Sequence, residues 1–159
     1  MAKLNNSQLA FEVLGKFRSI YGSAKNHFRQ IEEQCGISGS QLWILKEIAS
    51  NPDIGVTQVS EKLSIHQTTC SLLVEKLVKS KLITKERSQE DQRRVGLKAT
   101  DEGLAVLAKA PEPVEGILPS AVNGMDTESL DKLNRALSLL IAELDGYDNE
   151  LSNKPLADI

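Results

Sequence analysis

The sequence predicts a mainly α-helical protein with one small antiparallel β-hairpin near its middle. Apolar residues recur at steps of three and four over most of the chain, and the pattern changes to strict alternation only between residues 82 and 100. With 159 residues, 40% hydrophobic and 26% charged, the composition is that of an ordinary globular protein. No apolar run approaches the roughly 18 residues that span a bilayer, and no secretory leader pattern is present. We therefore expect a cytoplasmic protein without a membrane partner.

The first predicted helix is long and covers residues 8–34. Its apolar side chains form one stripe at helical spacing, and Gly36 supplies a stop signal. A second helix is predicted over residues 38–50, because Ser38 and Gln41 together make a capping-box signature.

Two shorter helices should follow, joined by only a few residues. Thr57 can cap the third, which runs to Leu63, and the fourth begins after His66. The alternating segments at residues 82–87 and 93–100 then predict the two strands of the hairpin.

The C-terminal part is predicted to be helical but interrupted. A fifth helix starts at Thr100 or Asp101. Prolines within residues 110–119 should break or kink the chain, because each removes an amide donor and clashes with the preceding turn. A last amphipathic helix is expected over residues 127–144, and the tail that follows should fray.

The order helix, short turn, helix and hairpin is that of a winged helix-turn-helix. The predicted domains are an N-terminal dimerisation helix in residues 1–35, a winged helix-turn-helix DNA-binding domain in 36–100, C-terminal dimerisation helices in 101–146 and a flexible tail in 147–159. The terminal helices carry apolar stripes beyond what so small a domain can cover. We therefore expect a homodimer.

Charge is distributed unevenly along the chain. The formal net charge is −3, yet residues 61–98 hold 9 Lys and Arg against 5 Asp and Glu, whereas residues 99–159 hold 4 against 12. A polyanion responds to the field within about 8 to 10 Å. The middle of the chain is therefore the place where double-stranded DNA could bind.

The fourth predicted helix has the residue types that read DNA. Its opening turns lack acidic side chains until Glu75 and present short or planar hydrogen-bonding groups, with Lys76 in reach of phosphates on a later turn. The predicted contacts in these opening turns are His66, Gln67, Thr68, Thr69 and Ser71.

The hairpin tip, residues 88–94, is predicted to be a second contact. Arg93 can enter a minor groove, where a narrow A·T tract concentrates negative potential, with Arg94 as a helper. Arg87 adds to the positive field along the hairpin. Asp91 is interpreted as structural, because it can hold the turn and pair with a nearby arginine.

The run D-Q-R-R-V-G-L-K-A-T-D-E-G resembles the wing signature of the MarR family of bacterial transcriptional regulators. Asp91 and Arg93 match its D-x-R, and Thr100 and Gly103 match its L-T-x-x-G, whereas Ala99 replaces the usual leucine. The resemblance extends over nearly the whole chain. It implies a homodimeric regulator, in our interpretation a repressor, that binds a pseudo-palindromic operator.

The resemblance also implies a small phenolic or aromatic effector, bound between the dimerisation region and the winged helix. Tyr21, His27 and Trp43 form the aromatic and imidazole cluster that helical spacing could bring together there. Ordinary core packing is the simpler interpretation of the same residues.

Three alternatives bear on function. A winged helix can serve as a protein–protein adaptor, and a regulator can sense oxidants through a thiol. Cys70 falls on an apolar helix face and should be buried, whereas Cys35 at a helix end is expected to be more exposed and is the better candidate sensor. No phosphate loop, metal constellation or activated nucleophile is recognisable, so neither an enzyme nor a cofactor is predicted.

Overall fold

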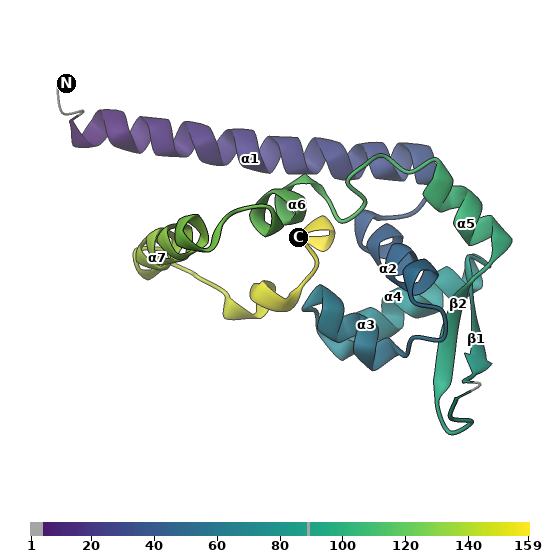
Figure 1. Ribbon diagram of the computed structural model, residues 1–159. Coiled ribbons are helices and arrows are strands. Elements are labelled where there is room, and N and C mark those ends of the chain that lie inside the picture. The colour runs from purple at the N-terminus through teal and green to yellow at the C-terminus, as the bar shows by residue number, and fades with distance from the viewer. Residues whose placement is uncertain (1–4, 89) are drawn as a thin grey trace.

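The computed structural model describes residues 5–88 and 90–159. Figure 1 shows the long first helix running along one side of the molecule, with the hairpin projecting from the body at the opposite end from the N-terminus. The helices are α1 (Asn6–Cys35), α2 (Gly39–Ser50), α3 (Val56–Leu63), α4 (Gln67–Lys79), α5 (Asp101–Ala108), α6 (Ile117–Asn123) and α7 (Thr127–Ala142). The hairpin strands are β1 (Ile83–Arg87) and β2 (Val95–Ala99). The predicted fold class, mainly helical with a small antiparallel sheet, is confirmed.

The first two helices are bounded by the expected signals. Gly36 ends α1 in the left-handed conformation at φ 70°, which glycine adopts without steric cost. Ser38 caps α2, and its capping box with Gln41 is complete. Residues 1–4 of the predicted N-terminal region lie outside the described residues.

Helix α3 begins one residue before the predicted cap at Thr57. Its N-cap is Gly55, whose backbone amide donates to the side-chain oxygen of Gln58 at 3.0 Å. The Thr57 hydroxyl instead accepts a hydrogen bond from the Gln67 side chain at 3.0 Å, so it joins α3 to α4. The prediction of the cap was wrong because Gln58 supplies the capping contact from inside the helix.

The wing is an antiparallel pair in which Ile83 lies opposite Ala99 and Arg87 opposite Val95. Ile54, in the turn before α3, adds an isolated bridge to Leu97. This bridge gives β2 a partner on its second edge and attaches the wing to the helical body. The hairpin tip takes up more residues than predicted, because β2 starts at Val95 rather than at residue 93.

The core lies between α2, α3, α4 and the base of the wing, and it includes the C-terminal end of α1. Fully buried side chains come from each of these elements: Ile31, Leu42, Ile44, Leu45, Ile48, Val59, Val74, Leu77, Ile83 and Leu97. Within the described ranges, no helix is long and apolar enough to cross a membrane.

Helix α5 approaches the base of the wing very closely. Thr100 caps it by accepting from the Gly103 amide at 3.1 Å, and the same hydroxyl donates to the Lys81 carbonyl at 2.7 Å. A Cβ atom on Gly103 would lie 2.2 Å from the Leu82 carbonyl oxygen. The threonine and glycine of the T-x-x-G segment therefore fasten the end of the wing to the body.

The proline-rich segment was only partly anticipated. The chain does leave the helix after Ala108, but Pro119 does not disturb α6. Pro119 is the third residue of α6, in the first turn, where a backbone amide has no acceptor within the helix to lose. The expectation that the prolines within residues 110–119 break or kink the chain was therefore wrong for Pro119.

The C-terminal tail is folded, contrary to the prediction of a flexible segment. It forms two short 3₁₀ turns, η1 (Asn149–Asn153) and η2 (Leu156–Asp158). The Ser40 hydroxyl, which is buried at the start of α2, donates to the Asp158 carboxylate at 2.9 Å. The Asn153 carbonyl accepts from the His66 backbone amide at 3.3 Å. The tail therefore returns from α7 to both α2 and the turn before α4.

Candidate nucleic-acid interface

Helix α4 has one face in the core and one in solvent. Cys70, Leu73, Val74 and Leu77 are buried, which leaves the intervening positions facing outward. Of the predicted contacts, His66, Gln67, Thr68 and Lys76 are exposed, and Thr69 and Ser71 are half-buried. The structure thus places the hydrogen-bonding groups of the opening turns on the accessible side of a helix held by its opposite face.

Gln67 is engaged in this structure. Its side-chain amide donates to Thr57 at 3.0 Å, while the oxygen of the same side chain remains able to accept. His66 is the N-cap residue of α4, and its side chain makes no capping bond. Its imidazole is therefore available at the exposed start of the helix.

The basic residues around α4 and the wing divide into two groups. Lys85 is paired with Glu75, and Lys98 with Glu86 at 2.9 Å. The Glu86 carboxylate raises the pKa of Lys98. Lys76, Arg87 and Arg93 are exposed, and among the described residues no carboxylate oxygen lies within 4 Å of their charged groups. The second group therefore supplies the charge that is free to meet a phosphate.

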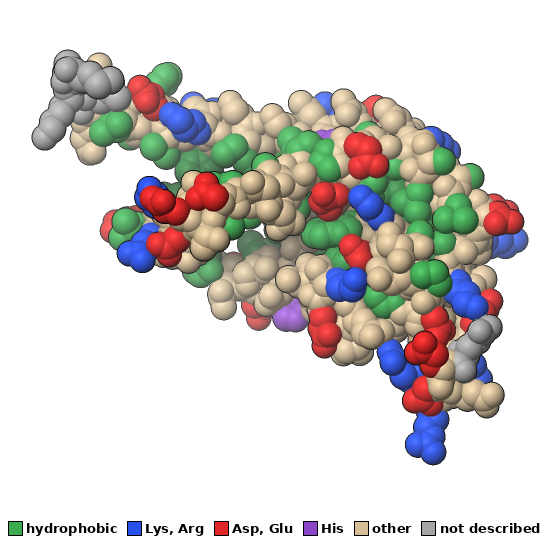
Figure 2. Space-filling model, in the orientation of Figure 1, with side chains coloured by type: hydrophobic (Ala, Val, Ile, Leu, Met, Phe, Trp, Pro, Cys, Tyr) green, Lys and Arg blue, Asp and Glu red, His purple; other side chains and the backbone are tan. Residues whose placement is uncertain are grey.

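Asp91 holds the wing tip through the backbone. Its carboxylate accepts from the Arg93 amide at 3.0 Å, and its carbonyl accepts from the Arg94 amide at 2.9 Å. An ion pair between Asp91 and a neighbouring guanidinium was expected, but none is formed within the described part of the tip. The Arg93 guanidinium is consequently left to solvent (Figure 2 shows Lys and Arg side chains at the end of the wing).

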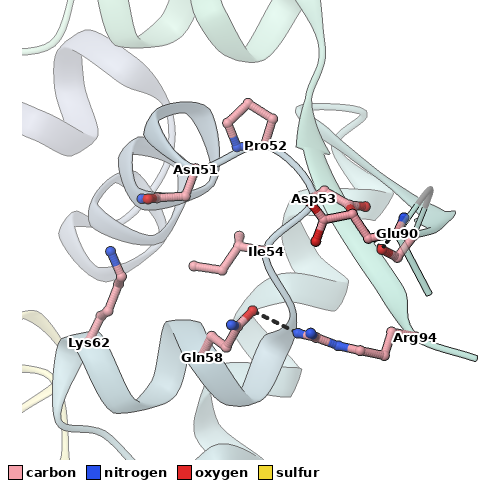
Figure 3. Close-up of a pocket in the computed structure, with 9 residues that line it drawn as sticks. Asn51, Pro52, Asp53, Ile54, Gln58, Lys62, Glu90 and Arg94 are labelled. Carbon is pink, nitrogen blue, oxygen red and sulfur yellow. Dashed lines mark hydrogen bonds between the residues drawn. The ribbon is translucent and has the colours of Figure 1, made fainter.

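Arg94 points in a different direction from that expected of a helper at the tip. Its guanidinium donates to the Gln58 side-chain oxygen at 2.9 Å and lies against the start of α3 (Figure 3). The two adjacent arginines are thus unequal: Arg94 braces the wing against α3. Gln89, which belongs to the predicted tip, lies outside the described residues.

The comparisons with known proteins agree with this architecture. Residues 36–94, which contain α2 to the wing tip, match the family model described as MarR family. A curated relative, the organic hydroperoxide resistance transcriptional regulator of Bacillus subtilis (strain 168), is 24% identical over 90% of both chains. These likenesses point to the MarR family for the winged helix-turn-helix part of the chain.

Two further likenesses agree with this match. The HTH-type transcriptional repressor MdtR of Bacillus subtilis (strain 168) is 21% identical over 60% of this chain, and the match spans 62% of MdtR. A solved structure titled as the S. aureus MepR–DNA complex has a TM-score of 0.55 at 21% identity, covering 81% of this chain and 95% of that one. This last likeness shows the fold. The two curated relatives are named as transcriptional regulators and not as enzymes.

The three residues of the predicted effector cluster, Tyr21, His27 and Trp43, make different contacts. Tyr21 is 61% exposed and lies beside Lys25, whose Nζ is 5.2 Å from the ring centroid. His27 is buried and its Nε2 lies 2.8 Å from the Pro113 carbonyl oxygen, so it ties α1 to the loop before α6. Trp43 packs against the core. The exposure of Tyr21 separates it from the other two, and core packing accounts for His27 and Trp43.

Sequence reasoning did not find an apolar groove beside α1. A groove of about 570 Å³ lies between α1, α6 and α7, and Leu156 of the tail also lines it. Its lining is almost entirely apolar and includes Val13, Phe17, Leu133 and Leu137. In Figure 2 hydrophobic side chains line the space between α1 and α7. The residues come from opposite ends of the sequence, so no local pattern could have shown that they share one wall.

Both thiols are buried, which corrects the expectation that Cys35 is exposed. Cys35 is 7% exposed because the C-terminal end of α1 packs into the core. Burial raises the pKa of the Cys35 thiol, partly offset by the charge of Lys109, and burial raises the pKa of Cys70 to about 11. A reactive thiol needs the opposite environment, with the thiolate stabilised and accessible.

Proposed function

We propose that this MarR-family chain is a sequence-specific double-stranded DNA-binding transcriptional regulator acting in the cytoplasm. One observation carries the proposal: the opening turns of α4 combine an exposed, acid-free set of hydrogen-bonding side chains with a rigidly buried opposite face. A helix presented in this way fits the ~12 Å major groove with its N-terminal residues at the base edges.

The contacts are assigned by residue type. His66, Gln67, Thr68, Thr69 and Ser71 face bases or nearby phosphates from the opening turns of α4. Lys76 and Arg87 contact phosphates, which carry most of the affinity without specifying sequence. Arg93 reaches the minor groove from the wing tip, whereas Arg94 acts indirectly through Gln58.

The regulator is proposed to act as a homodimer on a pseudo-palindromic operator. The exposed fractions of Phe11 (72%), Leu14 (53%) and Leu139 (73%) are high for large apolar side chains. They belong to α1 and α7, which Figure 1 places at the side of the molecule away from the wing. A second copy that covers these helices would present two α4 helices to successive major grooves, roughly 34 Å apart.

Release by a small aromatic or phenolic ligand is proposed as the control of a repressor. The apolar groove between α1, α6 and α7 is the binding site that replaces the predicted cluster of Tyr21, His27 and Trp43. A ligand that binds better to a dimer whose α4 helices are wrongly spaced must weaken DNA binding to the same extent, since coupling between two sites is reciprocal.

The test is selection of duplexes from a random pool with the purified protein, followed by fluorescence anisotropy on the selected duplex and on a scrambled duplex of equal composition. Specific binding should exceed binding to the scrambled duplex by at least ~10³-fold near physiological salt. Addition of small aromatic acids should then release the selected duplex. Equal affinity for both duplexes would contradict sequence-specific binding and favour the alternative of a winged-helix protein adaptor.

The burial and raised thiol pKa of Cys35 and Cys70 argue against the alternative of a thiol-based redox sensor.

A further inference from the structure

The turn between α2 and α3 contains a residue in an uncommon backbone conformation. Asp53 has φ 73°, in the left-handed region that side chains other than glycine, asparagine and aspartate rarely adopt. Its amide donates to the Leu97 carbonyl at 3.0 Å, and the Leu97 amide donates to the Ile54 carbonyl at 2.8 Å. The turn is thus bonded to strand β2, which orients the Asp53 side chain toward the root of the wing (Figure 3).

The Asp53 carboxylate reaches the wing tip through Ser88. The buried Ser88 hydroxyl donates to Asp53 Oδ2 at 2.6 Å. The same Ser88 oxygen accepts from the amides of Glu90 and Asp91, at 3.3 and 3.4 Å. Because the Asp91 carboxylate accepts from the Arg93 amide, these bonds connect the helical body to the backbone of Arg93.

Gly96 provides independent evidence that the carboxylate has a fixed place. A Cβ atom on Gly96 would lie 1.9 Å from Asp53 Oδ1, so that any other residue would displace the carboxylate. Strand interiors disfavour glycine, and a glycine there often marks the close approach of another group. The sequence of β2 therefore leaves a space that the Asp53 side chain occupies.

The other carboxylate oxygen, Asp53 Oδ1, is buried and has no hydrogen-bond partner among the described residues. An unsatisfied buried acceptor lowers the stability of the fold, so this placement of Asp53 does not stabilise the turn. The Asp53 carboxylate lies beside a polar pocket of about 270 Å³, whose lining includes Asp53, Ser88 and Arg94. Apolar packing therefore does not fill this part of the wing root.

We propose that Asp53 is a positioning residue for DNA binding, which holds the wing tip through Ser88 so that Arg93 is presented in one orientation. The proposal rests on the proposed function, since it assumes that Arg93 contacts DNA. Asp53 itself lies in the α2–α3 turn and is assigned no contact with the duplex.

The informative variant is Asp53→Gly, because glycine adopts φ 73° without strain and removes the whole side chain with its carboxylate. Operator affinity should fall about three- to tenfold, no more than in Arg93→Ala, with the unfolding midpoint in urea nearly unchanged. In an Arg93→Ala background the same substitution should cost less than twofold, since both changes act on the same interaction with DNA. Full additivity of the two effects would overturn the proposal.

Two controls separate positioning from general damage. Asp53→Asn keeps an acceptor oxygen and tolerates the left-handed backbone, so it should retain affinity within about threefold of wild type. Ser138→Ala, which removes an exposed hydroxyl bonded within α7, should have no effect. A decrease in Asp53→Asn as large as that in Asp53→Gly would contradict the hydrogen-bond role.

A DNA-free measurement distinguishes this proposal from the proposed function. Amide hydrogen exchange at Arg93 should accelerate at least tenfold in Asp53→Gly and in Ser88→Ala, but not in Ser138→Ala. Unchanged exchange would overturn the anchor even if DNA binding is established. Faster exchange in a protein that binds no operator would support the anchor and reject its role in DNA binding.

Discussion

At the residue scale, the two adjacent arginines of the wing show how far local sequence can lead. The sequence placed both on a hairpin tip and singled out Arg93 by the D-x-R pattern. It could not show that Arg94 turns to Gln58, because that partner lies 36 residues away on α3. Asp53 and Gly96 could not be predicted for the same reason: each is ordinary by itself, and only their contact explains both.

Gln67 has a similar double role. Its amide group is bonded to Thr57 in the free protein, although its residue type and position are typical of base recognition. Gln67 must break this hydrogen bond to Thr57 before both its side-chain amide and its side-chain oxygen can contact an adenine. The sequence could predict the position on α4, and the competing partner became visible only when α3 and α4 were packed together.

The buried Cys70 thiol makes a prediction for alkaline pH. Its pKa is raised from 9.0 to about 11, so between these values the unfolded chain loses a proton that the folded chain keeps. Stability therefore falls as pH rises through this window, by about 2 kcal/mol between pH 8 and pH 10.5. Urea unfolding at several pH values should show this decrease in wild type and a decrease smaller by that amount in Cys70→Ala. Identical pH profiles for wild type and Cys70→Ala would show that burial does not raise the pKa of this thiol.

At the element scale, the capping signals and periodicities predicted α1, α2, α4 and the hairpin closely, because these features act between neighbours in sequence. The C-terminal tail was missed because its contacts with Ser40 and with the His66 amide are long-range and use common polar groups. Pro119 was misjudged because its effect depends on whether it falls in the first turn or in the interior of a helix.

The close approach of α5 to the wing predicts a specific cost for Gly103→Ala. The added methyl would meet the Leu82 carbonyl oxygen at 2.2 Å, which also accepts from the Thr100 amide. We expect a decrease of about 1 to 3 kcal/mol in the free energy of unfolding, as for other overpacked sites. Gly124→Ala is the matched control, because its Cβ would meet nothing closer than 3.5 Å. Equal stabilities of the two variants would mean that α5 can move away from the wing freely.

At the scale of the whole molecule, the long apolar faces of α1 and α7 are the feature that a single chain leaves incomplete. The sequence indicated these stripes through their periodicity. It did not indicate that α6 and Leu156 would join them around one groove. A chain of this design is expected to be stable as an assembly, with association and folding linked.

Leu14→Glu tests this dependence on a second copy. The side chain is 53% exposed and belongs to the face of α1 that the second copy is proposed to cover. A buried carboxylate at a dimer interface is strongly unfavourable, so we expect the variant to sediment at half the mass of wild type at micromolar concentration. Asn26→Glu, an exposed polar position on the same helix, introduces the same charge and should leave the mass unchanged. Equal masses for wild type and Leu14→Glu would place the interface elsewhere.

The most direct test of DNA recognition by this winged helix is a salt series on the selected operator with wild type and Arg93→Ala. We expect Arg93→Ala to bind about tenfold more weakly. The slope of log affinity against log salt should be shallower by about one for each guanidinium removed, because fewer counterions are released from the DNA. Circular dichroism and sedimentation should show an intact dimer. Superimposable salt curves for the two proteins would contradict the account, because Arg93 would then not contact DNA.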